Sequence, residues 1–434
     1  MADYVPDGRR AWKIAALLFF FSVINFVDKL VMSLAAVPII KEFGLSPSQY
    51  GAVGSSFFFL YAISGLVVGL FVVHRTGPKR LLLALVAIWT IAQIPVVFSS
   101  SLLALYFGRI LLGIGEGPAT PSAYHALYGW FSNGRRNLPT SLLLAGVGCG
   151  FLIGAPLLTH IIAGYGWRAG FVLCGVIGFL WMVAWSVLGE DGPLIERHEA
   201  GAAPASVEWR RFWRDPSIVA NIVLAACSYW LTGLSITWLA PYLQLGLGYS
   251  AKDTGWLVSV ILGSQIIVQF SISWLSQRLL TTGYSSRLSR GVVMGLSMLI
   301  AGIVMVASTA VDQPVLKVLM LALAFTMPQI AFVIGPAVVG EIAPGHQRGT
   351  ALLVTYSIIT VSALMSPSLT GWVVQAAGDR PLTGYSHALW LTGAILCVGG
   401  LWGALKIDPE RSIARLGRAQ ANSVSDARTQ RSRI

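Results

Sequence analysis

A series of twelve apolar stretches, each of about 20 residues or more, limits what this chain can fold into. A helix of that length crosses the roughly 30 Å hydrocarbon core of a bilayer. Helices also satisfy their own backbone hydrogen bonds, as lipid surroundings require. The stretches lie approximately at 12–37, 49–73, 80–99, 101–130, 138–164, 168–188, 217–245, 252–279, 291–310, 314–340, 348–375 and 385–406. We therefore predict an all-α membrane protein with twelve transmembrane helices.

The overall composition agrees with this prediction. Hydrophobic residues make up 55% of the chain and charged residues 11%, a balance that would leave a soluble protein of 434 residues insoluble. The first apolar stretch is too long for a cleaved signal peptide, contains Asp28 and Lys29, and lacks a small-residue cleavage pattern. The four cysteines fall within apolar stretches without ligand-like spacing, so the sequence predicts no disulfide framework, no metal site and no cofactor.

One long hydrophilic interruption, 189–216, divides the apolar stretches into six and six. We predict an N-terminal six-helix half at 1–188, a cytoplasmic linker at 189–216 and a C-terminal six-helix half at 217–407. A basic tail at 408–434 is predicted to be cytoplasmic and disordered. The loops at 69–80 and 273–287 resemble each other weakly, which favours two related halves around a central cavity.

The distribution of basic residues predicts the orientation. If both termini are cytoplasmic, 23 of the 30 Lys and Arg residues lie in cytoplasmic segments, five lie outside and two lie within spans. This bias predicts a multi-pass protein of the inner (plasma) membrane with cytoplasmic termini. It also explains the net charge of +12 by orientation and by contact with anionic lipids, so nucleic acid is not predicted as a partner.

Four ionisable residues within the first and fourth apolar stretches point to the function. Asp28 and Lys29 lie in the first, and Arg109 and Glu116 lie in the fourth. A charge at bilayer depth costs several kcal/mol unless it faces a partner or a wet cavity. Arg109 and Glu116 are two helical turns apart, so they share nearly one face. Asp28 and Lys29 diverge by about 100° around their helix and need different partners, with Arg109 the natural one for Asp28 or for a substrate.

Several motifs carry a resemblance to a known family. They are INFVDK at 24–29, GRILLGIGEGPATPSAYHALYGWF at 108–131, GWRAGF at 166–171 and SPSLTGW at 366–372. With these motifs, residues 8–408 resemble the anion:cation symporter family of the major facilitator superfamily. Members of that family transport sugar acids, phthalate-type acids and sialic acid.

The resemblance implies roles for residues that match the family's motifs. It implies proton coupling by Asp28 and Glu116, anion binding by Arg109, and a cavity position for Tyr61. Lys29 stands where many members have Arg, which would grip a carboxylate with two parallel bonds. His74 stands where the family's loop signature usually has Asp. These departures weaken the inference of any specific substrate, whose chemistry can have diverged from that of the sugar acids.

The candidate site residues therefore fall into three groups. Asp28 and Glu116 are predicted to couple protons. The predicted substrate-binding residues are Lys29, Arg109, Tyr61, Tyr229, Trp238, Gln265, Gln269 and Tyr356. The predicted cytoplasmic gate comprises His74, Arg75, Arg80 and Arg135. Each group has a structural alternative: an ion pair between spans, aromatic packing, or a topology signal alone.

These features favour a proton-coupled symporter of an organic carboxylate, such as a sugar acid or an aromatic acid, that works by alternating access. An enzyme is not predicted, because no nucleophile accompanies a His or metal cluster. The alternatives are an organic-anion exchanger or uniporter without proton coupling, and a transporter-like nutrient receptor. The expected partners are a small organic anion, protons and membrane lipids, and a monomer is the family's default state.

Overall fold

The computed structural model of the chain describes residues 8–72, 75–131, 137–194, 209–343, 348–378 and 380–416, and within these ranges it contains helices and no strands. Twelve helical segments are long and apolar enough to cross a membrane, which confirms the predicted number. Their ends agree with the predicted stretches to within a few residues. The linker residues 195–208 and the tail residues 417–434 lie outside the described ranges.

The first six spans are formed by α1 (Gly8–Leu34), α3 (Pro47–Val67), α4 (Pro78–Phe98), α5 (Leu102–Glu116) with α6 (Ala119–Tyr128), α7 (Asn137–Tyr165) and α8 (Trp167–Leu188). The last six are formed by α10 (Pro216–Pro241), α11 (Ala251–Gly263) with α12 (Gln265–Thr281), α13 (Val293–Ser308), α14 (Pro314–Thr326) with α15 (Ala331–Ile342), α16 (Arg348–Ala376) and α17 (Pro381–Lys406). Short helices α2 (Ala36–Phe43) and α9 (Trp209–Phe212) lie outside the spans.

The fourth span is broken next to its acidic residue. Helix α5 ends at Glu116 and α6 begins at Ala119, with Gly117 and Pro118 between them. Proline has no backbone N–H and disfavours helical geometry at the residue before it, so a break here follows from the sequence. Glu116 consequently lies at a helix end deep within the span, while Arg109 lies two turns earlier on the same helix.

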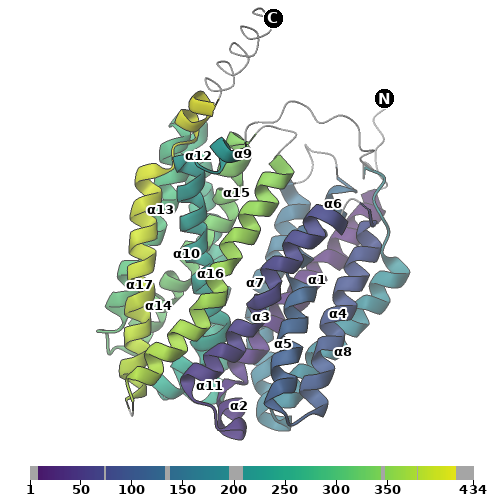
Figure 1. Ribbon diagram of the computed structural model, residues 1–434, viewed down its shortest axis with the longest axis vertical. Coiled ribbons are helices and arrows are strands. Elements are labelled where there is room, and N and C mark those ends of the chain that lie inside the picture. Colours follow the sequence, from purple (N-terminus) through teal and green to yellow (C-terminus); the bar gives the residue numbers. More distant parts are fainter. Residues whose placement is uncertain are drawn as a thin grey trace, which may run out of the picture.

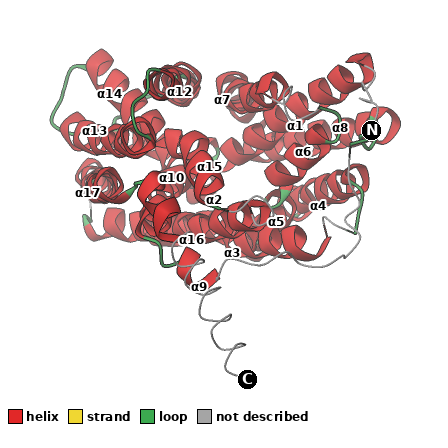
Figure 2. Ribbon diagram, turned by 90° about the horizontal axis from the view of Figure 1, so that it is seen from above, coloured by secondary structure: helices red, strands yellow, loops and turns green. Residues whose placement is uncertain are grey.

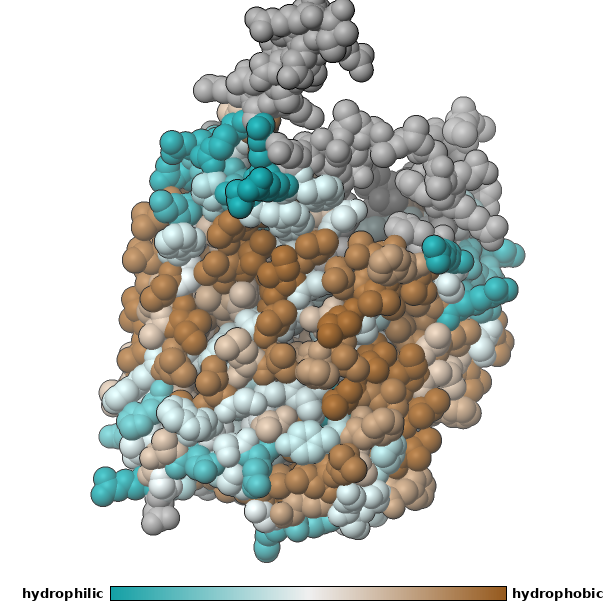
Figure 3. Space-filling model, in the orientation of Figure 1, coloured by the Kyte–Doolittle hydropathy of each residue, from teal (hydrophilic) through white to brown (hydrophobic). Residues whose placement is uncertain are grey.

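The helices form two groups that meet at one end of the molecule. In Figure 1 the groups lie against each other near α2 and α11 and diverge toward the end where α1 begins and α17 ends. Figure 2 shows the same two groups side by side from above. The principal contacts between the groups join α3 to α16 and α7 to α11. In Figure 3 apolar side chains form a belt around the middle, and hydrophilic side chains gather at both ends, as expected for a multi-pass membrane protein.

The contact between α3 and α16, here called the seam, is made by small residues and backbone. A Cβ atom on Gly51 would lie 2.3 Å from the carbonyl oxygen of Pro367, so only glycine permits this approach. The Ser368 hydroxyl and backbone N–H both hydrogen-bond Ser55 Oγ. The Tyr50 hydroxyl lies 2.8 Å from the carbonyl oxygen of Met32 in α1 and 3.3 Å from that of Thr237 in α10, either of which can accept its hydrogen. The seam therefore closes this end of the molecule by close backbone packing.

An ion pair fixes α2 to the start of α8 at the same end. Arg168 donates to both carboxylate oxygens of Glu42, at 2.7 and 3.0 Å, and Trp167 Nε1 donates to the same carboxylate at 2.7 Å. These hydrogen bonds hold the pKa of Glu42 below its usual value. The short helix α2, which hydrophobic periodicity did not predict, is held in place by this pair.

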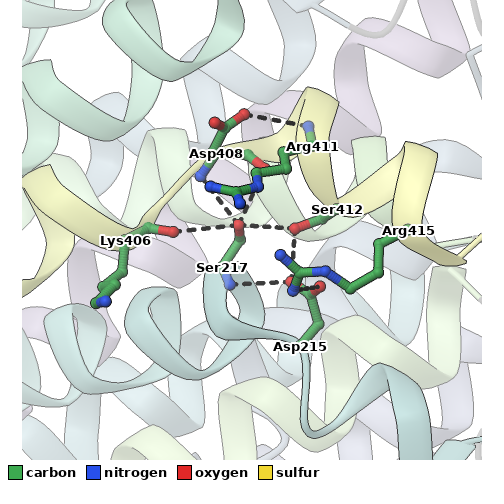
Figure 4. A network of polar contacts seen from close by, with 7 residues as sticks. All are labelled: Asp215, Ser217, Lys406, Asp408, Arg411, Ser412 and Arg415. Atoms are coloured by element: carbon green, nitrogen blue, oxygen red, sulfur yellow. Dashed lines mark hydrogen bonds and ion pairs between the residues drawn. The ribbon is translucent and has the colours of Figure 1, made fainter.

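Polar contacts at the opposite end join elements within the last six spans. Figure 4 shows Asp215 accepting hydrogen bonds from Ser217 N at 2.9 Å and from the Ser412 hydroxyl at 2.6 Å, and an ion pair with Arg415 at 3.1 Å. Residues 409–416 form a further helix. This differs from the disordered tail predicted from 408, because Ser412 and Arg415 anchor the first turns of the tail to the buried Asp215 carboxylate.

We expect Gly51→Ala to weaken closure of the seam. Overpacking of this kind costs about 1–3 kcal/mol, which corresponds to about a 5- to 150-fold shift toward the separated arrangement at this end. Maleimide labelling of Ser55→Cys, in a background without the four native cysteines, measures the shift as faster modification. Gly164→Ala is the matched control, since nothing lies within 4 Å of a Cβ at that position. Equal labelling in the two variants would contradict the role of the seam.

Candidate functional site

The structure brings the four intramembrane charged residues together between α1 and α5. The exposed fractions are 1% for Asp28, 5% for Lys29, 2% for Arg109 and 0% for Glu116, so none of the four side chains faces lipid. Asp28 interacts electrostatically with the other three, and Glu116 with both cations. What the site can bind depends on the contacts that each of these four side chains already makes.

Lys29 forms an ion pair with Glu116. Its Nζ atom lies 2.6 Å from Glu116 Oε2 and also donates to the Asn25 side-chain oxygen. The ammonium group lies 4.7 Å from the centre of the Phe26 ring, which adds a cation–π contact. Glu116 is the last residue of α5 and faces Lys29 of α1. The pair joins the first and fourth spans.

Asp28 has a different partner, as its angular separation from Lys29 predicts. Gln93 of α4 directs its side-chain nitrogen at both Asp28 carboxylate oxygens, at 3.0 Å each. Sequence reasoning did not identify Gln93, although it is a lone amide in an otherwise apolar third span. The expected pairing of Asp28 with Arg109 is not among the ion pairs within 4 Å that the described residues form.

Arg109 is buried and incompletely satisfied. Its guanidinium carbon lies 4.7 Å from the centre of the Phe57 ring, on the neighbouring helix α3. Within the described part of the chain, its Nε and Nη1 atoms have no hydrogen-bond partner. Buried donors are nearly always paired, since an unpaired donor costs about 1–3 kcal/mol and a charged one more. A planar guanidinium with free N–H groups is suited to bind a carboxylate through two parallel bonds.

Three tyrosines meet between the two groups of helices. Tyr229 of α10 and Tyr356 of α16 hydrogen-bond through their hydroxyls, and their rings pack edge to face at 5.6 Å. Tyr61 of α3 is buried and directs its hydroxyl to the same pair. Sequence analysis named each tyrosine separately, but it did not predict that they form one cluster.

The remaining candidates lie apart from this centre. Trp238 is buried beside the seam, where its indole N–H donates to the Pro367 carbonyl at 2.9 Å. Gln269 donates to the backbone carbonyl of Gln329 at 3.0 Å, and Gln265 is half-buried one turn earlier on α12.

The predicted cytoplasmic gate is described in part. Its members Arg75 and Arg80 are exposed at the end opposite the seam. His74 and Arg135 lie outside the described residues. The gate therefore stays a prediction from the sequence.

The geometry allows one specific chemistry. A guanidinium with free donors can bind an anion, and a carboxylate paired with a lysine can exchange that pairing for a proton. Because the two groups share one enclosed site, the occupancy of each affects the other.

Comparisons with known proteins agree with the fold. The sequence profile of the Major Facilitator Superfamily matches residues 17–328. The probable sulfoacetate transporter SauU of Cupriavidus necator is 28% identical over 411 residues, which cover 91% of this chain and 93% of that protein. The D-galactonate transporter of Escherichia coli is 24% identical over 420 residues, which cover 90% of this chain and 96% of that protein.

Solved structures share the arrangement of helices. A bacterial homolog of the human lysosomal transporter Spinster, in an inward-facing and unoccupied conformation, matches with a TM-score of 0.77 at 18% identity, covering 94% of this chain and 99% of that chain. The D-xylose-proton symporter matches with a TM-score of 0.71 at 14% identity, covering 92% and 99%. At these identities the likeness shows the fold alone.

Proposed function

The chain belongs to the major facilitator superfamily and is a transporter, and from this premise we propose that it carries a small organic anion together with protons by alternating access. The observation that carries the proposal is the buried Arg109, whose Nε and Nη1 have no hydrogen-bond partner among the described residues. Relatives named for sulfoacetate and D-galactonate support an anion bearing a carboxylate or sulfonate group.

Charge balance couples the anion to a proton. With both acids ionised, the two carboxylates and two cations of the site carry no net charge. A monovalent anion entering this neutral, enclosed site would leave a buried charge without compensation, which is strongly unfavourable. A proton on Glu116 removes that excess charge and releases Lys29. The anion then binds between Lys29 and Arg109 in a site that is again neutral.

Transport requires the two halves to move around this site. We place the seam on the outer side and both termini in the cytoplasm of the inner (plasma) membrane, in keeping with the Lys and Arg distribution. Opening of the seam would admit protons and anion from outside. Separation of the opposite ends would release them inside. The proton and the anion drive this cycle because each binds the two arrangements with different affinity.

Purified protein in liposomes tests the proposal. A thermal-shift panel of sulfoacetate, D-galactonate, an aromatic acid and a dicarboxylic acid is expected to contain a stabilising ligand, worth about 2.7 kcal/mol at a hundred times its Kd. That ligand, in radiolabelled form, should accumulate only when the medium is more acidic than the lumen. Equal accumulation without a proton gradient would favour an exchanger or uniporter, and binding without translocation would favour a receptor. Either outcome would overturn proton-coupled symport.

A further inference from the structure

We propose that Gln93 is a positioning residue that holds Asp28 away from Arg109 and so keeps the guanidinium free for the transported anion. This inference rests on the proposed function, because it assigns a task to a neighbour of the anion site. Gln93 is 4% exposed and comes from α4, whereas Asp28 comes from α1 and Arg109 from α5.

The contact is suited to an ionised carboxylate. A carboxamide nitrogen carries two hydrogens, and Gln93 Nε2 lies 3.0 Å from each of the two Asp28 oxygens. Asp28 is therefore satisfied without a cation. The amide adds no charge of its own, so the site stays electrically balanced while the carboxylate is fixed in direction.

The same amide can also serve the protonated acid. A neutral carboxyl group has one O–H donor, and a turned carboxamide offers its carbonyl oxygen to that O–H and its N–H to the other oxygen. Leucine or methionine offers neither group. A proton can thus arrive at Asp28 or leave it without a buried polar group losing its partner.

The other groups around Asp28 explain why its carboxylate must be fixed by Gln93. Its neighbour Lys29 is paired with Glu116 at 2.6 Å. Arg109 and Glu116 of α5 and Cys174 of α8 also act on Asp28. Arg109 carries free donors, so a carboxylate released from Gln93 would turn to it. That internal pair would occupy the donors that the anion needs.

Gln93→Met removes the amide and keeps a side chain of similar length. We expect anion affinity to fall about ten- to hundredfold at alkaline pH, at which Asp28 is ionised and competes for Arg109. At acidic pH the protonated Asp28 no longer competes, so the loss should shrink. A merely structural defect would weaken binding equally at both pH values. Gln277→Met, at an exposed position of α12, is the matched control.

A double variant separates the explanations further. Asp28→Asn removes the competing charge, so adding it to Gln93→Met is expected to restore anion affinity at alkaline pH. Affinity that stays as low as in the single variant would overturn the inference. The probes are sulfoacetate and D-galactonate, measured by thermal shift on the full chain.

Infrared spectroscopy keeps the inference testable if no probe binds and the proposed function fails. The difference between the spectra of the unaltered protein and Asp28→Asn identifies the carboxylate band of Asp28. We expect Gln93→Met to shift that band at alkaline pH, at which Asp28 is ionised, because the carboxylate exchanges an amide for a guanidinium. An unchanged band would overturn the inference independently of transport.

Discussion

Replacing Arg109 by methionine is expected to abolish anion binding while leaving the protein folded. Truncating one side of a buried charged pair costs about 2–5 kcal/mol, which weakens the affinity by about 30- to 5,000-fold. The change removes a guanidinium of which two donors already lack partners among the described residues, and methionine keeps the packing against Phe57. The two acids then face one cation, so uptake of a proton by one of them restores the charge balance of the ligand-free site.

Two measurements check this expectation. Thermal unfolding without ligand reports stability, and the shift on adding the transported anion reports binding. Arg109→Lys keeps the charge but loses the planar fork, so it should retain only part of the affinity. Arg278→Met, on the exposed end of α12, is the control for loss of an arginine. Anion binding by Arg109→Met with unaltered affinity would remove this residue from the site.

Replacing Glu116 by glutamine is expected to end proton-driven accumulation and to spare exchange of anion across the membrane. The amide has nearly the shape of the protonated acid, so Lys29 is released permanently and no proton is needed to release it. Anion binding then no longer depends on protonation, so the proton gradient cannot drive accumulation. Uphill uptake should fall to the level of passive equilibration, whereas counterflow of labelled against unlabelled anion should continue.

Proteoliposomes loaded with unlabelled anion distinguish the two activities. Counterflow and gradient-driven uptake are measured on the same preparation, with and without a protonophore. Glu42→Gln is the matched control, since Glu42 pairs with Arg168 outside the spans and away from the site. Undiminished uphill uptake by Glu116→Gln would refute the assignment of Glu116 to proton coupling.

The sequence predicted the spans well and their contacts poorly, for a physical reason. Length and apolarity mark each crossing of the bilayer, so the twelve spans appeared with nearly correct ends. The partner of Asp28 did not appear, because spans such as α4 are apolar around most of their circumference. Periodicity then does not reveal which face meets a neighbour. Gln93 therefore became visible as a partner only once α1 and α4 were in contact.

The candidate site was likewise predicted only in part: its charged residues were identified, but their contacts were not. Charges at bilayer depth identified Asp28, Lys29, Arg109 and Glu116, since lipid makes such residues expensive. The particular pairing of Lys29 with Glu116 depends on how α1 and α5 are turned toward each other, which the sequence pattern does not reveal. The tyrosine cluster joins spans that are far apart in the chain, and no local pattern predicts such a meeting.

The composition of the seam has a consequence for how the environment controls the protein. Glycine, serine hydroxyls and backbone carbonyls form the contacts between α3 and α16. None of these groups titrates near neutrality, and none is an ion that dissolved salt would screen. Acidity and ionic strength therefore have little direct effect on closure of the seam. Any sensitivity of the seam to acid must be transmitted from the buried charges between α1 and α5.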